Sequence, residues 1–521
     1  MSGRHYYITT PIYYVNDVPH IGHAYTTLAC DVLARFKRLD GYDVRFLTGT
    51  DEHGQKVEKA AAAAGLAPKA FTDKVSQAFR DLVAKMNYSP DNFIRTTEPR
   101  HYKASQALWE KLVASGDIYL GSYAGWYSVR DETYFVEGET EVGPDKKRRA
   151  TATGAEVEWV EEPSYFFKLS AWADRLLAFY EQNPGFIGPD SRRNEILSFV
   201  RGGLQDLSVS RTSFSWGVPV PGDTRHIMYV WLDALTNYIT ECGYPDTNDP
   251  LWKYWPADLH MVGKDIIRFH CVFWPAFLMS AGIAPPKRVF AHGWWTNEGQ
   301  KISKSLGNVI DPNELVATYG LDAVRYFLLR EVPFGNDGDF QRKALIGRLN
   351  GDLANAYGNL CQRVLSIVAK NCESRVPAQG PLTDADNALL DRARGLLAAV
   401  RKELDEQAFH KALTTIWEVI ADANRYVDAQ APWALAKTDP AKQGTVLYVT
   451  AEVIRQVAIL VQPFIPASAA KLLDILAIPE SERGFDRLGD AGKRIKPGTQ
   501  LPPPAPVFPR YIEPDAAAAK A

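Results

Sequence analysis

The segment that decides the fold reads Tyr6-Tyr-Ile-Thr-Thr-Pro-Ile-Tyr-Tyr-Val-Asn-Asp-Val-Pro-His-Ile-Gly-His23, and Val44-Arg-Phe-Leu-Thr48 follows it. The aromatic and β-branched run Tyr6–Thr10 predicts a buried strand that Pro11 closes. Apolar residues at helical spacing predict a helix over 21–39, and Val44–Thr48 predicts a second strand. A strand, a helix and a strand in so short a stretch form a βαβ unit, which requires a parallel sheet.

Farther along the chain, the same pattern is interrupted and then returns. Strands are expected at Leu259–Gly263 and Arg288–His292, with a helix over 266–281 between them. The region 117–225 carries many aromatics and short β-like runs, which indicates an inserted α+β subdomain. From about residue 346, long amphipathic segments separated by Pro and Gly predict a helical bundle. These segments are 354–369, 388–407, 409–430 and 445–461.

These patterns predict an α/β fold: a Rossmann-like parallel-sheet domain with an α+β insertion, followed by an α-helical bundle. The expected boundaries are 1–116 and 226–291 for the two halves of the Rossmann domain, 117–225 for the insertion, 292–345 for a loop region, 346–500 for the bundle and 501–521 for a C-terminal tail.

The composition narrows the class of protein. The chain has 521 residues, 46% hydrophobic and 23% charged, as in soluble proteins of more than one domain. The net charge of −3 gives no global basic field, so any nucleic acid must bind at local patches. Five cysteines without a Cys-x-x-Cys pair argue against a disulfide framework. No signal peptide or membrane span is expected, which favours a cytoplasmic protein.

A first candidate site is His20-Ile-Gly-His23. This loop joins a strand to a helix, at the sheet edge where open α/β folds bind ligands. His20 and His23 share one face of the helix start, where free amides suit phosphate, and Gly22 would let a flat base approach. Two surface histidines that cap a helix would give the same pattern.

A second candidate is Lys301-Ile-Ser-Lys-Ser305, which lies between loop-forming residues. Two lysines three positions apart on a loop can close over a polyphosphate as point charges. A solvated basic loop is the alternative interpretation.

Taken together, the two motifs resemble the HIGH and KMSKS signatures of class I aminoacyl-tRNA synthetases, and their order and wide separation also fit. The resemblance implies that an amino-acid carboxylate attacks the α-phosphorus of ATP with Mg²⁺ assisting, and that the 3′ ribose of a tRNA then attacks the adenylate. It implies catalytic roles for His20, His23, Lys301 and Lys304, and ATP contacts from Gly22, Gly263, Asp265, Ser303 and Lys304.

Four further segments resemble the methionyl branch of this family. They are Thr10-Pro-Ile-Tyr-Tyr-Val-Asn16, Leu47-Thr-Gly-Thr-Asp-Glu-His-Gly54, Tyr229-Val-Trp-Leu-Asp-Ala234 and Gly263-Lys-Asp-Ile-Ile-Arg-Phe-His270, and the likeness runs from about residue 4 to about 515. The resemblance implies that the chain activates L-methionine with ATP, releases pyrophosphate, and charges tRNA(Met), both initiator and elongator.

Two apolar stripes at helical spacing are candidates for the amino-acid pocket. They are Trp231, Ala234, Leu235 and Tyr238, and Ile266, His270 and Trp274. Ordinary core packing would give the same stripes, but the resemblance implies that they line the methionine site together with Ile12 and Tyr14. Aromatic faces suit a polarisable sulfur, and Asp51 would pair with the substrate ammonium. One methylene is worth roughly 1–3 kcal/mol in such a pocket, so homocysteine is the expected misfit.

The insertion bears on whether the chain binds zinc and on the alternative assignments of its function. Methionyl enzymes often carry cysteine-ligated zinc knuckles there, but Ser128 stands where a thiolate would be, and no Cys lies between Cys30 and Cys242. We therefore expect a zinc-free insertion. It is too short for the hydrolytic domain of isoleucyl, valyl and leucyl enzymes, and a cysteinyl enzyme would need a zinc-bound pocket. A catalytically silent tRNA-binding protein is the alternative from another class; the intact histidines and lysines argue against it.

In the bundle, the resemblance implies that Asn359, Arg363 and Trp433 contact the anticodon. An Asn can read a base edge, an Arg can stack or bond, and a Trp can stack an unpaired base. Each residue alone is more often a packing or capping residue. The chain shows no appended OB-fold region after 512, so a monomer is expected.

Overall fold

The computed structural model of the protein describes residues 3–15, 18–303 and 306–513. The chain divides into two compact units. The sheet unit is Gly3–Pro19 with Asp43–His292, and the helical unit is Met1–Ser2, His20–Tyr42 and Gly293–Ala521. The helix predicted over 21–39 therefore belongs to the same unit as the bundle.

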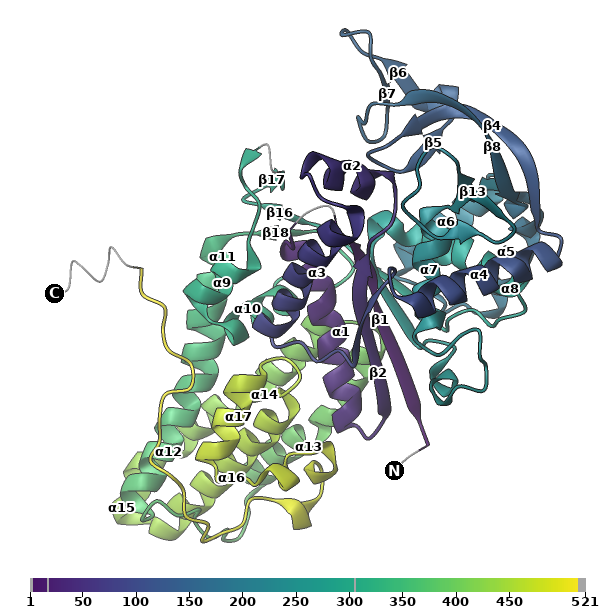
Figure 1. Cartoon of the computed structure of the whole chain (residues 1–521). Helices are drawn as coiled ribbons and strands as arrows, with labels where there is room; N and C mark the ends of the chain where they lie inside the picture. The colour runs from purple at the N-terminus through teal and green to yellow at the C-terminus, as the bar shows by residue number, and fades with distance from the viewer. Residues whose placement is uncertain (1–2, 16–17, 304–305, 514–521) are drawn as a thin grey trace. The chain divides into compact units, whose positions relative to one another are not determined.

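Within the described residues of the sheet unit, six parallel strands form the main sheet, in the order β3-β2-β1-β14-β15-β9. Figure 1 shows β1 and β2 side by side within it. The strands are β1 (His5–Tyr14), β2 (Asp43–Asp51), β3 (Asn92–Arg95), β14 (Leu259–Gly263), β15 (Val289–His292) and β9 (Ile187–Gly188). The chain winds outward from β1 to β3 and returns on the other side at β14. The switch between β1 and β14 is where such sheets bind ligands, beyond their carboxyl ends.

β1 continues through Pro11, so the expectation that Pro11 closes the strand is wrong. The register with β2 shifts between Thr9 and Ile12, and this bulge accommodates a residue that has no N–H to donate. The strand thereby reaches Tyr14, which is the register partner of Asp51. The bulge thus brings two predicted site residues to one edge of the sheet.

The insertion is built mainly of antiparallel strands, as its short β-like runs predict. The longest pair is β4 (Ile118–Ser128) with β8 (Glu158–Phe167). The other strands are β5 (Thr133–Phe135), β6 (Thr140–Val142), β7 (Arg148–Ala150), β10 (Leu207–Ser208), β11 (Ser210–Arg211), β12 (Pro219–Val220) and β13 (Asp223–Met228). β9, inside the region 117–225, pairs instead with β15 in the main sheet.

The remaining helices of the sheet unit are α2 (Gln55–Ala63), α3 (Pro68–Lys85), α4 (Pro99–Ala114), α5 (Ala173–Gln182), α6 (Asp190–Arg201), α7 (Val230–Thr240) and α8 (Trp274–Ser280). Short 3-10 segments lie at Glu137–Glu139, Leu169–Trp172, Pro250–Tyr254 and Lys264–Ile266. A large hydrophobic core joins α4, α7 and α8 to the sheet.

The single helix expected over 266–281 is wrong in detail. A 3-10 turn leads into a π-helical segment, Phe269–Phe273, before α8 begins. Pro275 cannot donate to the carbonyl four residues earlier, that of Cys271. The Tyr180 hydroxyl donates to this carbonyl at 2.6 Å instead. The proline therefore explains why the helix is irregular beside the predicted pocket.

The helical unit contains α1 (Ile21–Leu39), α9 (Pro312–Tyr319), α10 (Leu321–Arg330), α11 (Arg342–Arg348), α12 (Asn359–Asn371), α13 (Asp384–Asp405), α14 (Phe409–Gln430), α15 (Pro432–Thr438), α16 (Pro440–Leu460) and α17 (Pro466–Ile475). It also contains β16 (Trp295–Asn297), β17 (Gln300–Lys301) and β18 (Gly338–Phe340), a π-helical segment at Leu349–Gly358, and 3-10 turns at Glu480–Glu482, Phe485–Arg487 and Ala491–Lys493.

α16 is the centre of the bundle, because its side chains are buried on every side from Gln443 to Leu460. It begins at Pro440, earlier than expected, since the Asp439 side chain accepts from the Lys442 N–H and caps it. The predicted helices over 21–39 and 409–430 are confirmed at both ends. Among helices of the described residues, none combines the length and apolar character that a membrane span needs.

Candidate active site

The start of α1 is organised by its own histidines. Nδ1 of His20 accepts from the Gly22 N–H at 3.0 Å, and Nδ1 of His23 accepts from the His20 N–H at 3.1 Å. Because both Nδ1 atoms are acceptors, each neutral ring carries its hydrogen on Nε2. A Cβ on Gly22 would lie 2.9 Å from the His20 ring, so the glycine makes room for this capping arrangement. Both Nε2–H groups are thus donors suited to phosphate oxygens.

The charge state of His23 follows from its surroundings. Burial, and then the neighbouring His20, lower the pKa of His23 well below its usual value. The two rings lie 3.9 Å apart between centroids, so two positive charges there would repel. At neutral pH, His23 is therefore a neutral donor rather than a cation.

The second motif lies on a short hairpin of the same unit. Lys301 ends β17 and is exposed to solvent. Asn308 fastens the loop, because its side chain accepts from the Ser303 N–H at 2.8 Å and donates to the Lys301 carbonyl at 3.0 Å. Lys304 and Ser305, which the sequence analysis also assigned to this motif, lie outside the described residues.

In the sheet unit, predicted residues gather at the carboxyl ends of three neighbouring strands. β1 ends at Tyr14, β2 at Asp51 and β14 at Gly263. Asp265 follows on an exposed turn, and a Cβ on Gly263 would lie 2.5 Å from its Oδ1. Gly263 therefore leaves room for the Asp265 carboxylate in this position.

Asp51 is a buried carboxylate, only 7% exposed. Its Oδ1 is buried and makes no hydrogen bond to any of the described residues. Burial first, and then the charges of Asp233, Glu132 and Glu52, raise the pKa of Asp51 well above its usual value. A buried acceptor without a donor, in a negative field, suits a cationic ligand group.

The two predicted stripes meet in one hydrogen-bonded aromatic cluster. The Tyr238 hydroxyl donates to Nε2 of His270 at 2.7 Å, since Nδ1 of His270 donates to the Ile266 carbonyl at 3.0 Å. Burial lowers the pKa of His270 to about 4, so the ring is neutral at pH 7. Trp231 stacks on Phe269 with ring centroids 3.8 Å apart.

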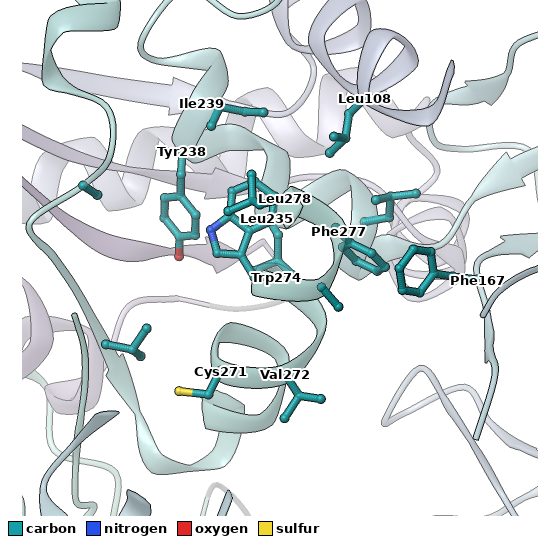
Figure 2. Packing of buried hydrophobic residues seen from close by; sticks show 14 of the residues in the cluster. Leu108, Phe167, Leu235, Tyr238, Ile239, Cys271, Val272, Trp274, Phe277 and Leu278 are labelled. Atoms are coloured by element: carbon teal, nitrogen blue, oxygen red, sulfur yellow. The ribbon is translucent and has the colours of Figure 1, made fainter. Parts of the chain in front are cut away.

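The cluster has a buried side and a half-buried side. Leu235, Tyr238 and Trp274 belong to the continuous core, as Figure 2 shows, whereas Trp231 and Ile266 pack on it only partly buried. The other predicted pocket residues divide in the same way, with Ala234 and His270 buried and with Ile12 and Tyr14 half-buried. The half-buried side, rather than the core side, is where a ligand can enter.

Several residues of this region were missed by the sequence analysis. Asp233 accepts from His53 at 2.6 Å and from His101 at 2.7 Å, and its pKa falls to about 2 because the two histidines outweigh the effect of burial. Glu132, from the insertion, accepts from the Tyr14 hydroxyl at 2.5 Å. His53 and Asp233 lie inside motifs quoted above, but nothing in the spacing of these four residues along the chain predicts that they meet.

In the bundle, Arg363 and Trp433 lie side by side. The Arg363 guanidinium lies 5.8 Å from the Trp433 ring centroid and pairs with Asp428 at 2.8 Å. The chain turns at Ala431 in a left-handed conformation, and α15 then presents Trp433 half exposed. Asn359, at the start of α12, is exposed as well. An exposed indole beside a guanidinium is a platform on which a base can stack.

In the insertion, Ser128 is buried and accepts from the Asp131 N–H at 3.0 Å. It therefore closes the turn between β4 and β5 by a hydrogen bond. Among the described residues, no group of three or more His, Cys, Asp or Glu side chains is arranged to hold a metal ion.

Comparisons with known proteins identify the family of the chain. The family described as tRNA synthetases class I (M) matches residues 6–365, and the anticodon binding domain of methionyl tRNA ligase matches residues 376–520. A methionine–tRNA ligase of Brucella suis is 61% identical over 99% of both chains. The structure of Mycobacterium tuberculosis methionyl-tRNA synthetase in complex with methionyl-adenylate is similar with a TM-score of 0.95, at 57% identity over 97% of this chain and 100% of that one. The apo form of that protein gives a TM-score of 0.89, at 53% identity over 98% of this chain and 99% of that one.

Proposed function

This chain belongs to the methionyl family of class I tRNA synthetases, and we propose that it performs the family's reaction with the residues described above. It activates L-methionine with ATP to methionyl-adenylate and pyrophosphate, and it transfers the methionyl group to the 3′ end of tRNA(Met). The proposal includes both the initiator and the elongator tRNA. The observation that carries the assignment of residues is the buried carboxylate of Asp51 in the same unit as a neutral aromatic cluster.

In the first step, the substrate carboxylate attacks the α-phosphorus, and negative charge grows on the phosphate oxygens. The Nε2–H groups of His20 and His23 donate to those oxygens, and Lys301 and Lys304 neutralise the leaving pyrophosphate. Gly22, Gly263, Asp265 and Ser303 contact the nucleotide. Mg²⁺ commonly binds through substrate phosphates with few protein carboxylates, which fits motifs made of histidine and lysine. When bound, it supplies further neutralisation of the phosphates.

The methionine side chain lies against the half-buried side of the aromatic cluster. Its thioether meets neutral rings, because His270 keeps no charge at pH 7 and Trp231 offers an aromatic face. The α-ammonium group pairs with Asp51, whose Oδ1 has no other donor among the described residues. The neutral rings favour methionine over a charged or strongly polar side chain, whereas the Asp51 pairing recognises a group that all amino acids share.

ATP–pyrophosphate exchange measured with each of the twenty amino acids and with homocysteine tests the assignment. We expect methionine to drive exchange best, with homocysteine as the nearest competitor because it differs by one methylene. Exchange driven best by another amino acid would overturn the proposed function.

The anticodon assignment has a separate test. Trp433→Ala is expected to lower kcat/KM for tRNA charging by about 5- to 150-fold, since stacking one base contributes about 1–3 kcal/mol. ATP–pyrophosphate exchange should remain unchanged, because α15 carries no residue assigned to activation. Trp433→Phe should retain most of the charging activity. Equal charging by the alanine variant and the unchanged protein would rule out the stacking role.

We also propose that the insertion folds without zinc, that the protein is a monomer, and that it acts in the cytoplasm. The hydrogen bond that closes the Ser128 turn supports the first point. Stoichiometric zinc in the purified protein, or a dimer mass in solution, would contradict the corresponding proposal.

A further inference from the structure

Four buried carboxylates interact at the end of β2, within the sheet unit. They are Asp51, Glu52, Glu132 and Asp233, and none is more than 9% exposed. Asp51 ends β2 and Glu52 follows it, Asp233 lies on α7, and Glu132 comes from the insertion. Such a concentration of buried negative charge is costly unless cations or donors compensate it.

Two of the four are compensated within the protein. Arg95 donates to both oxygens of Glu52, at 2.6 and 2.9 Å. Asp233 lies between His53 and His101. Neither carboxylate therefore requires a ligand.

The other two, Asp51 and Glu132, carry negative charge that the hydrogen bonds found here balance only in part. Oδ1 of Asp51 has no donor among the described residues. Glu132 accepts from the neutral hydroxyl of Tyr14 at 2.5 Å and, weakly, from the Lys56 N–H at 3.4 Å. The Lys56 ammonium lies 5.5 Å from the Tyr14 ring centroid and lowers the pKa of Glu132, an effect that burial outweighs.

Glu132 packs closely against the turn at Gly54. Gly54 has φ +112, and a Cβ there would lie 2.7 Å from Oε1 of Glu132 and 2.8 Å from the Tyr14 hydroxyl oxygen. Only glycine fits between these two side chains. Glu132 itself has φ +47, an uncommon conformation for a residue with a side chain. The insertion therefore places this carboxylate against Tyr14 and the turn that follows Asp51.

We propose that Glu132 is a positioning residue for the amino-acid substrate. It holds Tyr14 against the Gly54 turn, and together with Asp51 it forms a negatively charged binding site for the α-ammonium group. This inference rests on the proposed function, because the ammonium belongs to methionine. It gives the insertion a part in amino-acid binding, through a residue that touches Tyr14 rather than the reacting atoms.

Glu132→Gln keeps the size of the side chain and removes its charge. We expect KM for methionine in ATP–pyrophosphate exchange to rise about 10-fold, because a buried charge near the ammonium is lost. KM for ATP should stay within about two-fold, and kcat within about three-fold. Glu141→Gln, at an exposed site on β6, is the matched control and should behave like the unchanged protein.

A ligand without the ammonium group separates a charge effect from a structural one. The probe is 4-(methylthio)butanoate, which is methionine without its amino group, used as an inhibitor of exchange. Its inhibition constant should be the same for Glu132→Gln and the unchanged protein, while methionine binding weakens. Equal weakening of both ligands, or no weakening of either, would overturn the inference.

The acid side of the pH profile provides a second readout. The charges of Asp233, Glu132 and Glu52 act on Asp51. Arg95 pairs with Glu52, His53 and His101 bond Asp233, and Lys56 and Arg211 lower the pKa of Glu132. The negative charge of Glu132 raises the pKa of Asp51, so Glu132→Gln should shift the acid limb of kcat/KM for methionine to lower pH. An unshifted limb would contradict the inference.

Two further variants guard against loss of folding, which a thermal melt monitors. Glu132→Asp keeps the charge but shortens the reach to Tyr14, and it should retain part of the preference for methionine over 4-(methylthio)butanoate. Tyr14→Phe combined with Glu132→Gln should be non-additive in KM for methionine, because the two residues act through one hydrogen bond. Additive effects would overturn the inference. If the unchanged protein itself failed to exchange with methionine, the proposed function would fail and this inference with it.

Discussion

His23→Ala is expected to lower kcat for ATP–pyrophosphate exchange by about 100- to 1000-fold, the usual cost of removing one donor to a developing negative charge. Nδ1 of His23 accepts from the His20 N–H, which fixes the tautomer that carries the hydrogen on Nε2. The low pKa keeps the ring neutral, so the donor is present throughout the physiological pH range. KM for methionine should change by less than about three-fold, because the loss falls on the transition state.

The control for this variant is His5→Gln, which changes a histidine that bonds Asp43 at the start of β1. It should leave exchange within about two-fold of the unchanged protein. A His23→Ala protein that melts normally and retains more than a tenth of the turnover would remove His23 from the catalytic residues.

Asp51→Asn is expected to raise KM for methionine by about 30- to 5000-fold, since loss of one partner of a buried charge pair costs about 2–5 kcal/mol. The asparagine keeps the size of the side chain but offers the ammonium group no charge. Steady-state exchange over a range of methionine concentrations measures the effect. Asp174→Asn, at an exposed position on α5, is the control and should leave KM unchanged.

The same variant tests the pH dependence. The raised pKa of Asp51 means that kcat/KM for methionine falls as pH drops through that value, because the carboxylate becomes neutral. In Asp51→Asn this acid limb should disappear. An identical limb in both proteins would assign it to another group.

Asp51→Asn should weaken methionine binding but should not destabilise the folded protein. A carboxyl group whose pKa is raised by folding destabilises the folded protein at pH values above its unfolded pKa. Asp51→Asn should therefore melt at the same or a higher temperature than the unchanged protein at pH 7. The difference should vanish as pH falls toward 4.

Local sequence patterns correctly predicted the helices and strands that form through residues close to one another in the chain. The helices over 21–39 and 409–430 have the predicted bounds, because periodic apolar residues and end signals are local features. The parallel sheet followed from the βαβ pattern in the same way. Pro11 misled the prediction because a bulge, which depends on the partner strand, absorbs its missing donor. The π-helical segment was missed because the group that relieves it, Tyr180, lies far away in the chain.

By itself, the sequence determined the family, the parallel sheet with its insertion and helical bundle, and the residue types available at each motif. These follow from local spacing and from short motifs, which need no knowledge of distant contacts. Only the tertiary structure decided which charged side chains lie close enough to change one another's pKa. Asp51, Glu132 and Asp233 are far apart in the chain, and their interaction and burial exist only once the sheet unit has folded. Burial and neighbouring charge set the pKa of a carboxyl group, and both are properties of the fold rather than of spacing in the sequence.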